Sequence, residues 1–120
     1  MTSSPVKLYG IANCDTIRKA RNWLDGNAIA FDFHDYRKQG VDMVLLQSMA
    51  ASLGWEIMLN RRGTTWRALP DAVKNSIDRD SALQLMLENP AIIKRPILDR
   101  DNQFFIGFND QQYQEIFDQA

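Results

Sequence analysis

The spacing of apolar residues divides the first third of the chain into a strand, a helix and a second strand. Residues 6–9 form a short, mostly apolar run that predicts a buried strand. An apolar face at helical spacing follows, and glycine is common just past a helix end, so we predict a helix over residues 15–25 that ends before Gly26. Apolar and polar residues alternate over residues 29–36, as in a half-buried strand. One helix between two short strands favours a βαβ unit with parallel strands.

Residues 41–89 have the patterns of a series of helices. The predicted helix starts are Asp42, then Thr64 or Thr65, then Asp71, and last Asp80–Ser81. Gly54 ends the first of these helices and Asn89–Pro90 ends the last, because glycine and proline interrupt helical structure. We therefore expect this segment to be entirely helical.

The last third of the chain predicts an antiparallel hairpin followed by a helix. Strands over residues 91–98 and 103–108 flank a turn-forming Asp-Arg-Asp-Asn segment. Pro96 has no N–H for a sheet ladder, so it belongs at an end, an edge or a bulge. Asn109 is suited to cap a last helix, whose apolar face comprises Tyr113, Ile116 and Phe117. The order β-α-β, helices, β-β-α predicts an α/β fold in which helices cover a mixed sheet.

Composition and charge narrow the classes of function. The chain has 120 residues and is 45% hydrophobic, which is enough for one domain with its own core. Its net charge of -1 gives no basic field for nucleic acid or for a membrane surface. No apolar run reaches transmembrane length, and the first residues lack the apolar core of a secretory signal. A single cysteine cannot form an internal disulfide, which is typical of a reducing compartment, so we expect a cytoplasmic protein. We find no cluster of histidine, cysteine and aspartate residues at the spacing of metal ligands.

Cys14, the one cysteine, follows the first predicted strand and lies at the start of the first predicted helix. Unpaired N–H groups and the positive end of the helix dipole favour an anion there, and a thiolate is such an anion. Arg18 and Arg21 add positive charge within two turns, and Arg18 is near enough to reach a ligand bound at the sulfur. Thr16 is suited to hydrogen-bond the sulfur or a bound anion, or only to cap the helix. The alternative is an inert cysteine that packs as a small apolar residue.

Three segments, residues 14–21, 94–97 and 106–109, carry a resemblance to a known family. Together with the predicted order of strands and helices, they resemble the ArsC/Spx family of arsenate reductase-like proteins, and most closely its YffB-like subgroup. The resemblance implies a thioredoxin-like (glutaredoxin-like) α/β fold: a four-stranded mixed sheet with an all-helical insertion after the second strand. In this interpretation residues 1–120 form one domain, with a core of about residues 6–36 and 91–117 and an insertion of about residues 41–89.

The resemblance also implies roles for individual residues. Cys14 matches the nucleophile of ArsC-type reductases, and Arg95 matches the arginine before their cis-proline, which is Pro96 here. A second family arginine falls at Arg61 or Arg62, with Arg62 preferred. The expected site for substrate or glutathione around Cys14 therefore comprises Thr16, Arg18, Arg61, Arg62, Arg95 and Pro96.

The function that this reading predicts is a glutathione-dependent thiol reductase. Because no second cysteine can resolve a covalent intermediate at Cys14, glutathione or a glutaredoxin is the expected partner, with glutathione as co-substrate and no bound cofactor. The expected substrate is a disulfide, a glutathione mixed disulfide or a small oxyanion. A further arginine of true arsenate reductases is replaced by Gly107–Phe108, which puts arsenate in doubt. The alternative is a regulator that, like Spx, binds the C-terminal domain of the RNA polymerase alpha subunit, although Ile17 replaces the second cysteine of the Spx Cys-x-x-Cys motif.

Overall fold

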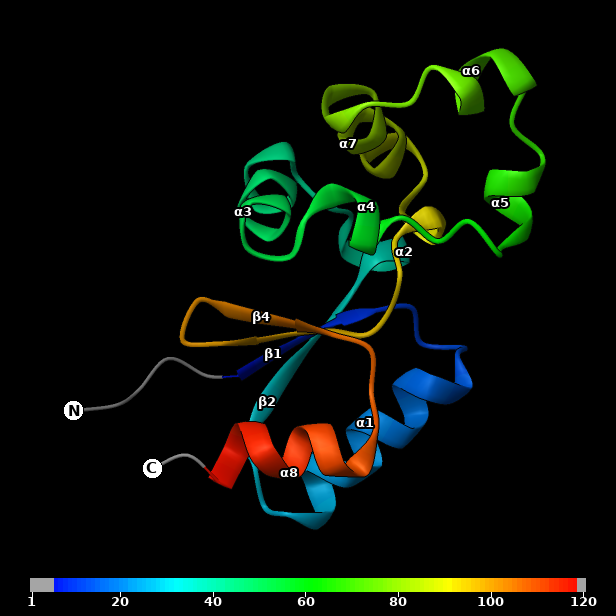
Figure 1. The fold of residues 1–120 in the computed structure, drawn as a ribbon. Coiled ribbons are helices and arrows are strands. Elements are labelled where there is room, and N and C mark those ends of the chain that lie inside the picture. Colours follow the sequence, from blue (N-terminus) through cyan, green and yellow to red (C-terminus); the bar gives the residue numbers. More distant parts are fainter. Residues whose placement is uncertain (1–5, 119–120) are drawn as a thin grey trace. The chain divides into compact units, whose positions relative to one another are not determined.

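The computed structural model describes residues 6–118, which form two compact units (Figure 1). The sheet unit combines Met1–Asp35 with Arg95–Ala120, and the helical unit is Tyr36–Lys94. The helical unit is therefore inserted in the chain between the second and third strands of the sheet unit.

A four-stranded mixed sheet forms the centre of the sheet unit. Its strands are β1 (Val6–Gly10), β2 (Phe31–Asp35), β3 (Ile97–Arg100) and β4 (Gln103–Ile106), in the order β2-β1-β3-β4. β1 pairs in parallel with β2 and antiparallel with β3, and β3 and β4 form an antiparallel hairpin. The predicted βαβ unit, hairpin and mixed sheet are confirmed, although β2 and β4 are shorter than the predicted strands over residues 29–36 and 103–108.

Two helices of the sheet unit, α1 (Asp15–Gly26) and α8 (Asp110–Asp118), lie side by side on one face of the sheet (Figure 1). The rings of Trp23 and Tyr113 join them edge to face, with 5.5 Å between centroids. Tyr113 is fully buried, and the core around it contains Leu8, Ala20, Leu24, Leu98 and Ile116. Asn109 caps α8 as predicted, because its side chain accepts a hydrogen bond from the N–H of Gln112 (2.7 Å).

The helical unit consists of short helices joined by tight turns. They are α2 (Tyr36–Gln39), α3 (Met43–Leu53), α4 (Trp55–Met58), α5 (Thr64–Arg67), α6 (Asp71–Asn75), α7 (Arg79–Glu88) and the 3-10 turn η1 (Pro90–Ile92). α3 packs against α4 and α7, and α7 packs against η1. The side chains that fill this small core include Leu46, Met49, Met58, Leu83, Met86 and Ile92. Asp42 caps α3 as predicted, since its carboxylate accepts the N–H of Leu45 (2.7 Å).

The predicted strand over residues 91–98 is wrong in its first half. Pro90 begins η1 instead, because its fixed φ and missing N–H suit the first position of a helical turn. Ile93 is fully buried and forms only an isolated antiparallel bridge with Leu59. The ladder of the sheet begins only at Ile97.

Two predicted helix caps in the helical unit are wrong. Asp78, not Asp80–Ser81, is the N-cap of α7, because Asp78 and Ser81 form a capping box: each side chain accepts the N–H of the other residue at 2.9 Å. The N-cap of α5 is Gly63, without a side-chain cap, and α5 begins at Thr64.

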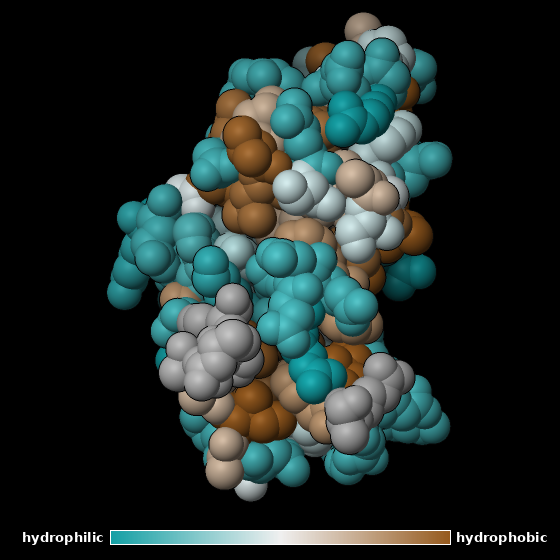
Figure 2. All heavy atoms as spheres, turned by 90° about the vertical axis from the view of Figure 1, so that its left-hand side faces the viewer, coloured by the Kyte–Doolittle hydropathy of each residue, from teal (hydrophilic) through white to brown (hydrophobic). Residues whose placement is uncertain are grey.

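Hydrophilic residues cover most of the face drawn in Figure 2, and apolar residues show between them in several separate groups. Within the described chain, the large apolar side chains that protrude are Val44 and Ile57, both in the helical unit. None of the helices formed by residues 6–118 is long and apolar enough to cross a membrane.

Candidate active site

Cys14 lies between β1 and α1, at the N-cap position of α1. Its extended backbone (φ -132°, ψ 130°) turns the chain from strand to helix, and its carbonyl accepts a helical hydrogen bond from the N–H of Arg18 (3.0 Å). Cys14 carries no side-chain oxygen that could accept a cap hydrogen bond at this position. The N–H groups of the first turn therefore stay available to a thiolate or to a bound anion.

The surroundings of Cys14 lower the pKa of its thiol below the ordinary value. Partial burial raises the pKa, because it takes water away from the charged form. Hydrogen bonds from the backbone N–H groups of Ile17 and Thr16 lower the pKa, as do a hydrogen bond from the Arg95 side chain and its positive charge. Together these donors outweigh the burial, so the thiolate is more abundant near neutral pH than at an ordinary cysteine.

Arg95 reaches Cys14 from the segment that leads into β3. The Arg95–Pro96 peptide bond is cis, as the family resemblance implies. The carbonyl of Pro96 accepts a hydrogen bond from the N–H of Gly107 (2.8 Å), and the φ of Gly107 is 80°, a conformation that favours glycine. This contact ties both ends of the hairpin together next to Arg95.

Gly10, the last residue of β1, is a site residue that the sequence reasoning missed. A Cβ atom at Gly10 would lie 2.2 Å from Cδ1 of Ile17, 2.9 Å from its Cγ1 and 3.6 Å from Cβ of Arg95. Ile17 is fully buried, so it has little room to move away. The missing side chain therefore lets the first turn of α1 and Arg95 both approach the end of the strand. A glycine at the end of the first apolar run was the only signal in the sequence.

Thr16 and Arg18, two of the predicted site residues, lie in the first turn of α1. Thr16 contributes its backbone N–H, and Arg18 pairs with the carboxylate of Asp15. The guanidinium that lowers the pKa of the thiol is that of Arg95. Asp15 precedes Arg18 by three residues, a spacing at which opposite charges pair on a helix, and the role of Arg18 toward a ligand at the sulfur stays a prediction.

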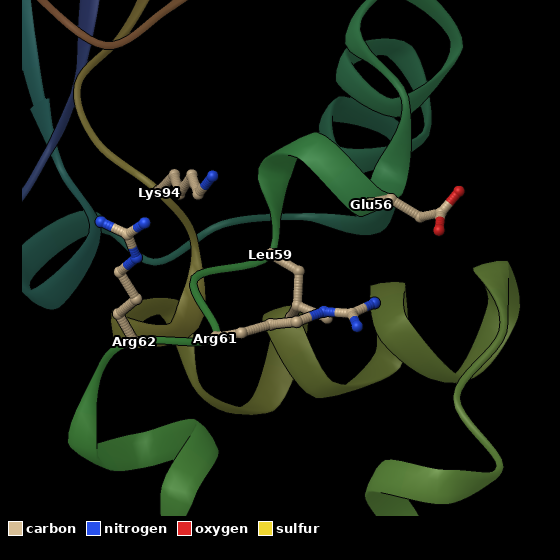
Figure 3. Close-up of a pocket in the computed structure, with 5 residues that line it drawn as sticks. All are labelled: Glu56, Leu59, Arg61, Arg62 and Lys94. Atoms are coloured by element: carbon tan, nitrogen blue, oxygen red, sulfur yellow. The ribbon is translucent and has the colours of Figure 1, made fainter.

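The other two predicted arginines belong to the helical unit. Arg61 and Arg62 line a pocket of 340 Å³ with Glu56, Leu59 and Lys94, which we call the cationic pocket (Figure 3). In Figure 3 the charged ends of Arg62 and Lys94 lie on one side of the pocket, and those of Arg61 and Glu56 lie on the other. The Arg61 guanidinium lies over the ring of Trp66, 5.4 Å from its centroid, which fixes its position.

The cationic pocket holds three basic side chains and one carboxylate, in contrast to the nearly neutral chain. Within residues 6–118, neither arginine nor Lys94 takes part in an ion pair. The backbone holds the lysine in place, since its N–H donates to the carbonyl of Met58 (2.7 Å). The pocket is therefore suited to an anion, which a guanidinium binds through parallel N–H donors.

A carboxylate that the sequence reasoning also missed lies at the end of β2. Asp35 is buried and pairs in register with Gly10, so it lies near the start of the loop over residues 11–14 that carries Cys14.

His34, interpreted from the sequence as structural, packs its ring against that of Tyr9, with 5.1 Å between the ring centroids. The described residues contain no group of three acidic, histidine or cysteine side chains placed to hold a metal ion.

One protein-family model, that of the ArsC family, matches residues 9–116 of the chain. The chain belongs to the ArsC family. The match spans nearly all of the sheet unit and the whole helical unit. The resemblance seen in the sequence is thus confirmed.

Relatives in the ArsC family include enzyme-like proteins and regulators. The solved structure of a protein named YFFB is 44% identical, covers 92% of this chain and 96% of its own, and has a TM-score of 0.88. An arsenate reductase (ArsC) related protein from Brucella melitensis is 45% identical over 98% of both chains, with a TM-score of 0.77. The global transcriptional regulator Spx of Streptococcus agalactiae is 28% identical over 89% of this chain and 79% of Spx. The predicted α/β fold with a four-stranded mixed sheet and the YffB-like subgroup are therefore confirmed as well.

Proposed function

We propose that this ArsC-family protein is a glutathione-dependent thiol reductase in which Cys14 is the nucleophile. The observation that carries the proposal is the position of Cys14 at the start of α1, where two backbone N–H groups and the Arg95 side chain face its sulfur and lower the pKa of the thiol. The thiolate is the reactive form of cysteine, and this environment increases its share at neutral pH. Likeness to an arsenate reductase related protein at 45% identity supports the same class of chemistry.

The reaction consists of two thiol–disulfide exchanges. The Cys14 thiolate attacks the glutathione sulfur of a mixed disulfide, so that a Cys14–glutathione disulfide forms and the substrate leaves as a thiolate that takes up a proton. A second glutathione thiolate then attacks the sulfur of the bound glutathione, which forms oxidised glutathione and releases the Cys14 thiolate. In the net reaction the mixed disulfide and one glutathione thiol become the free substrate thiol and oxidised glutathione, and the proton that this glutathione gives up balances the proton taken up by the substrate thiolate. Arg95 stabilises the Cys14 thiolate, which is the attacking group in the first step and the leaving group in the second.

A small anion is the ligand proposed for the cationic pocket of the helical unit. Arg61, Arg62 and Lys94 offer several N–H donors, and no ion pair among the described residues competes for them. Gly107–Phe108 stands where true arsenate reductases carry a further arginine, and Gly107 is occupied with the turn after β4. A disulfide substrate is therefore favoured over arsenate.

The test is the turnover of a glutathionylated peptide with excess glutathione, followed by the appearance of oxidised glutathione. We expect Cys14→Ser to abolish turnover and to leave the circular dichroism spectrum and thermal unfolding nearly unchanged, because serine is close in size. Asn13→Ser, in the same exposed loop, is the matched control and should keep full activity. Retained turnover in Cys14→Ser, or a wild-type rate no higher than that of glutathione alone, would overturn the proposal.

A second candidate function is that of a regulator, which the 28% identity to Spx favours. Residue 17, which would be the second cysteine of a Cys-x-x-Cys switch, is a fully buried isoleucine here. Binding of the purified chain to the C-terminal domain of the RNA polymerase alpha subunit, measured by calorimetry, tests this function. Tight binding together with an inactive Cys14 would replace the reductase proposal.

A further inference from the structure

A second polar hollow lies along α1, entirely within the sheet unit. It has a volume of 230 Å³ and is lined by Ala12, Arg18, Arg21, Asn22 and Asp25, and we call it the α1 hollow. The four helical residues recur at spacings of one turn, so they share a face of α1. Ala12 precedes Cys14 by two residues in the same loop. The α1 hollow therefore begins at the loop that carries the nucleophile and follows the helix away from it.

The α1 hollow offers charges of both signs to a ligand. Arg21 is held in place, because its guanidinium lies 4.6 Å from the centroid of the Phe33 ring. Arg18 is already paired with Asp15. In the part of the chain that the structure describes, Arg21 and Asp25 form no ion pair with each other or with another residue. One guanidinium, one carboxylate and the amide of Asn22 thus remain for a ligand, whereas the cationic pocket offers three cations and a single carboxylate.

We infer that the α1 hollow binds the γ-glutamyl group of glutathione while its sulfur is bonded to Cys14, an inference that rests on the proposed function. The γ-glutamyl group carries an α-carboxylate and an α-ammonium on one carbon atom, so it needs a cation and an anion close together. Arg21 and Asn22 are donors for the carboxylate, and Asp25 is an acceptor for the ammonium. A volume of 230 Å³ is below the ~300 Å³ at which pockets for drug-sized ligands begin, so it fits one amino-acid-sized group rather than the whole tripeptide.

The length of glutathione agrees with this placement. A helix rises about 1.5 Å per residue, so Arg21 and Asn22 lie roughly 10–12 Å along the axis from Cys14. The cysteinyl and γ-glutamyl residues span roughly 10 Å, counting about 3.5 Å for each extended residue and the extra methylene groups of the γ linkage. Asp25 lies one turn further, but helical side chains lean toward the N-terminus, which brings its carboxylate back toward the ligand.

The first exchange step alone tests the inference. The Cys14 thiolate attacks a symmetrical disulfide, one half stays on Cys14 and the other leaves as a thiolate. We would measure the second-order rate constant of this adduct formation by mass spectrometry with three disulfides: oxidised glutathione, oxidised γ-glutamylcysteine, which lacks glycine, and oxidised cysteinylglycine, which lacks the γ-glutamyl group. The wild type should prefer the two γ-glutamyl disulfides. Arg21→Ala and Asp25→Asn should each lower their rates about tenfold relative to oxidised cysteinylglycine, as expected for loss of one charge-assisted hydrogen bond.

Lys19→Ala is the matched control, because it removes one exposed positive charge from α1 outside the hollow and should leave the preference unchanged. For each variant, we would divide the rate with a γ-glutamyl disulfide by the rate with oxidised cysteinylglycine. Comparing this ratio with the same ratio of the wild type cancels differences between the leaving thiols. An unchanged ratio in Arg21→Ala and Asp25→Asn, or equal slowing with all three disulfides, overturns the inference and leaves the reductase proposal standing. A wild type that reacts with none of them faster than free N-acetylcysteine does overturns the proposed function itself.

Discussion

The Cys14 site and the cationic pocket use basic residues in two different ways. At Cys14 one guanidinium, that of Arg95, acts directly on the sulfur, together with two backbone N–H groups from α1. In the cationic pocket three exposed basic side chains surround a solvated hollow, and no ion pair with a described residue holds them. The arrangement at Cys14 lowers the pKa of one sulfur atom, while the cationic pocket gathers positive charge that attracts an anion. Geometry should therefore dominate at Cys14, and ionic strength should dominate at the cationic pocket.

The largest effect is expected from Gly10→Ala, which tests geometry at Cys14. The new methyl group collides with the buried Ile17 side chain and moves the first turn of α1 away from the sulfur. We expect a loss of about 100-fold in the exchange rate, as for a misplaced reactive group, and of about 1–3 kcal/mol in the free energy of unfolding. Both are measurable, by stopped-flow kinetics and by urea unfolding.

Gly26→Ala is the matched control, because a Cβ at this helix end meets nothing within 4 Å. It should keep the rate and the stability of the wild type. If Gly10→Ala behaved in the same way, the close approach of α1 to β1 would not matter for the Cys14 site.

A smaller effect is expected from Arg95→Ala, which separates the two arginine environments. Loss of the guanidinium should raise the pKa of Cys14 toward ~8.5 and lower the exchange rate at pH 7 about tenfold. The measurement is the rate of alkylation by iodoacetamide as a function of pH. Arg95→Lys, which keeps the charge, should restore part of the shift, and Arg62→Ala should leave the midpoint unchanged. A shifted midpoint in Arg62→Ala would erase the distinction between the two sites.

A still smaller effect is expected in the cationic pocket itself. Single substitutions Arg61→Ala, Arg62→Ala and Lys94→Ala should each weaken the binding of inorganic phosphate about two- to fivefold, as for exposed charges. The difference should vanish in roughly 1 M salt, where the screening length is about 3 Å. Chemical-shift titration would measure the affinities. Arg79→Ala, whose side chain pairs with Asp80 on α7, is the control and should have no effect.

The smallest effect is the pH dependence of stability that follows from the pKa of Cys14. The thiol ionises at lower pH in the folded chain than in the unfolded chain, so the unfolded state binds more protons between the two pKa values. Relative to Cys14→Ser, the wild type should gain stability as the pH rises through the lowered folded pKa, level off above ~8.5 and lose this contribution on acidification. Urea unfolding of both proteins from pH 6 to pH 9.5 measures it. A constant difference over this range would mean that the folded thiol has an ordinary pKa.

Local patterns predicted the fold well where local chemistry decides it. The Asp42 and Asn109 caps and the apolar face that includes Tyr113 each depend on neighbours three or four positions away. The strand predicted from residue 91 failed because its isoleucines pack into the helical unit, and an apolar run does not reveal its distant partners.

In the candidate site, too, the features set by near neighbours in the sequence could be predicted, and those set by distant residues could not. Cys14 was found because the start of a helix can be read locally. Arg95 was suggested only by resemblance, and its contact with the thiol joins distant parts of the chain. Gly10 was missed because its constraint is a contact with Ile17 that no spacing rule encodes, and the pairing of Arg18 with Asp15 was not predicted.

The burial of Ile17 also determines how the protein would respond to its surroundings. A buried isoleucine occupies the position in the first turn of α1 where a second cysteine could stand, and the sequence has only one cysteine. No other sulfur of the chain can therefore displace a group bonded to Cys14 and restore its thiol. In the proposed cycle the adduct persists until another thiol molecule collides with it. Its lifetime is then set by the abundance of that molecule, so the fraction of chains carrying the adduct would report how much free thiol is present.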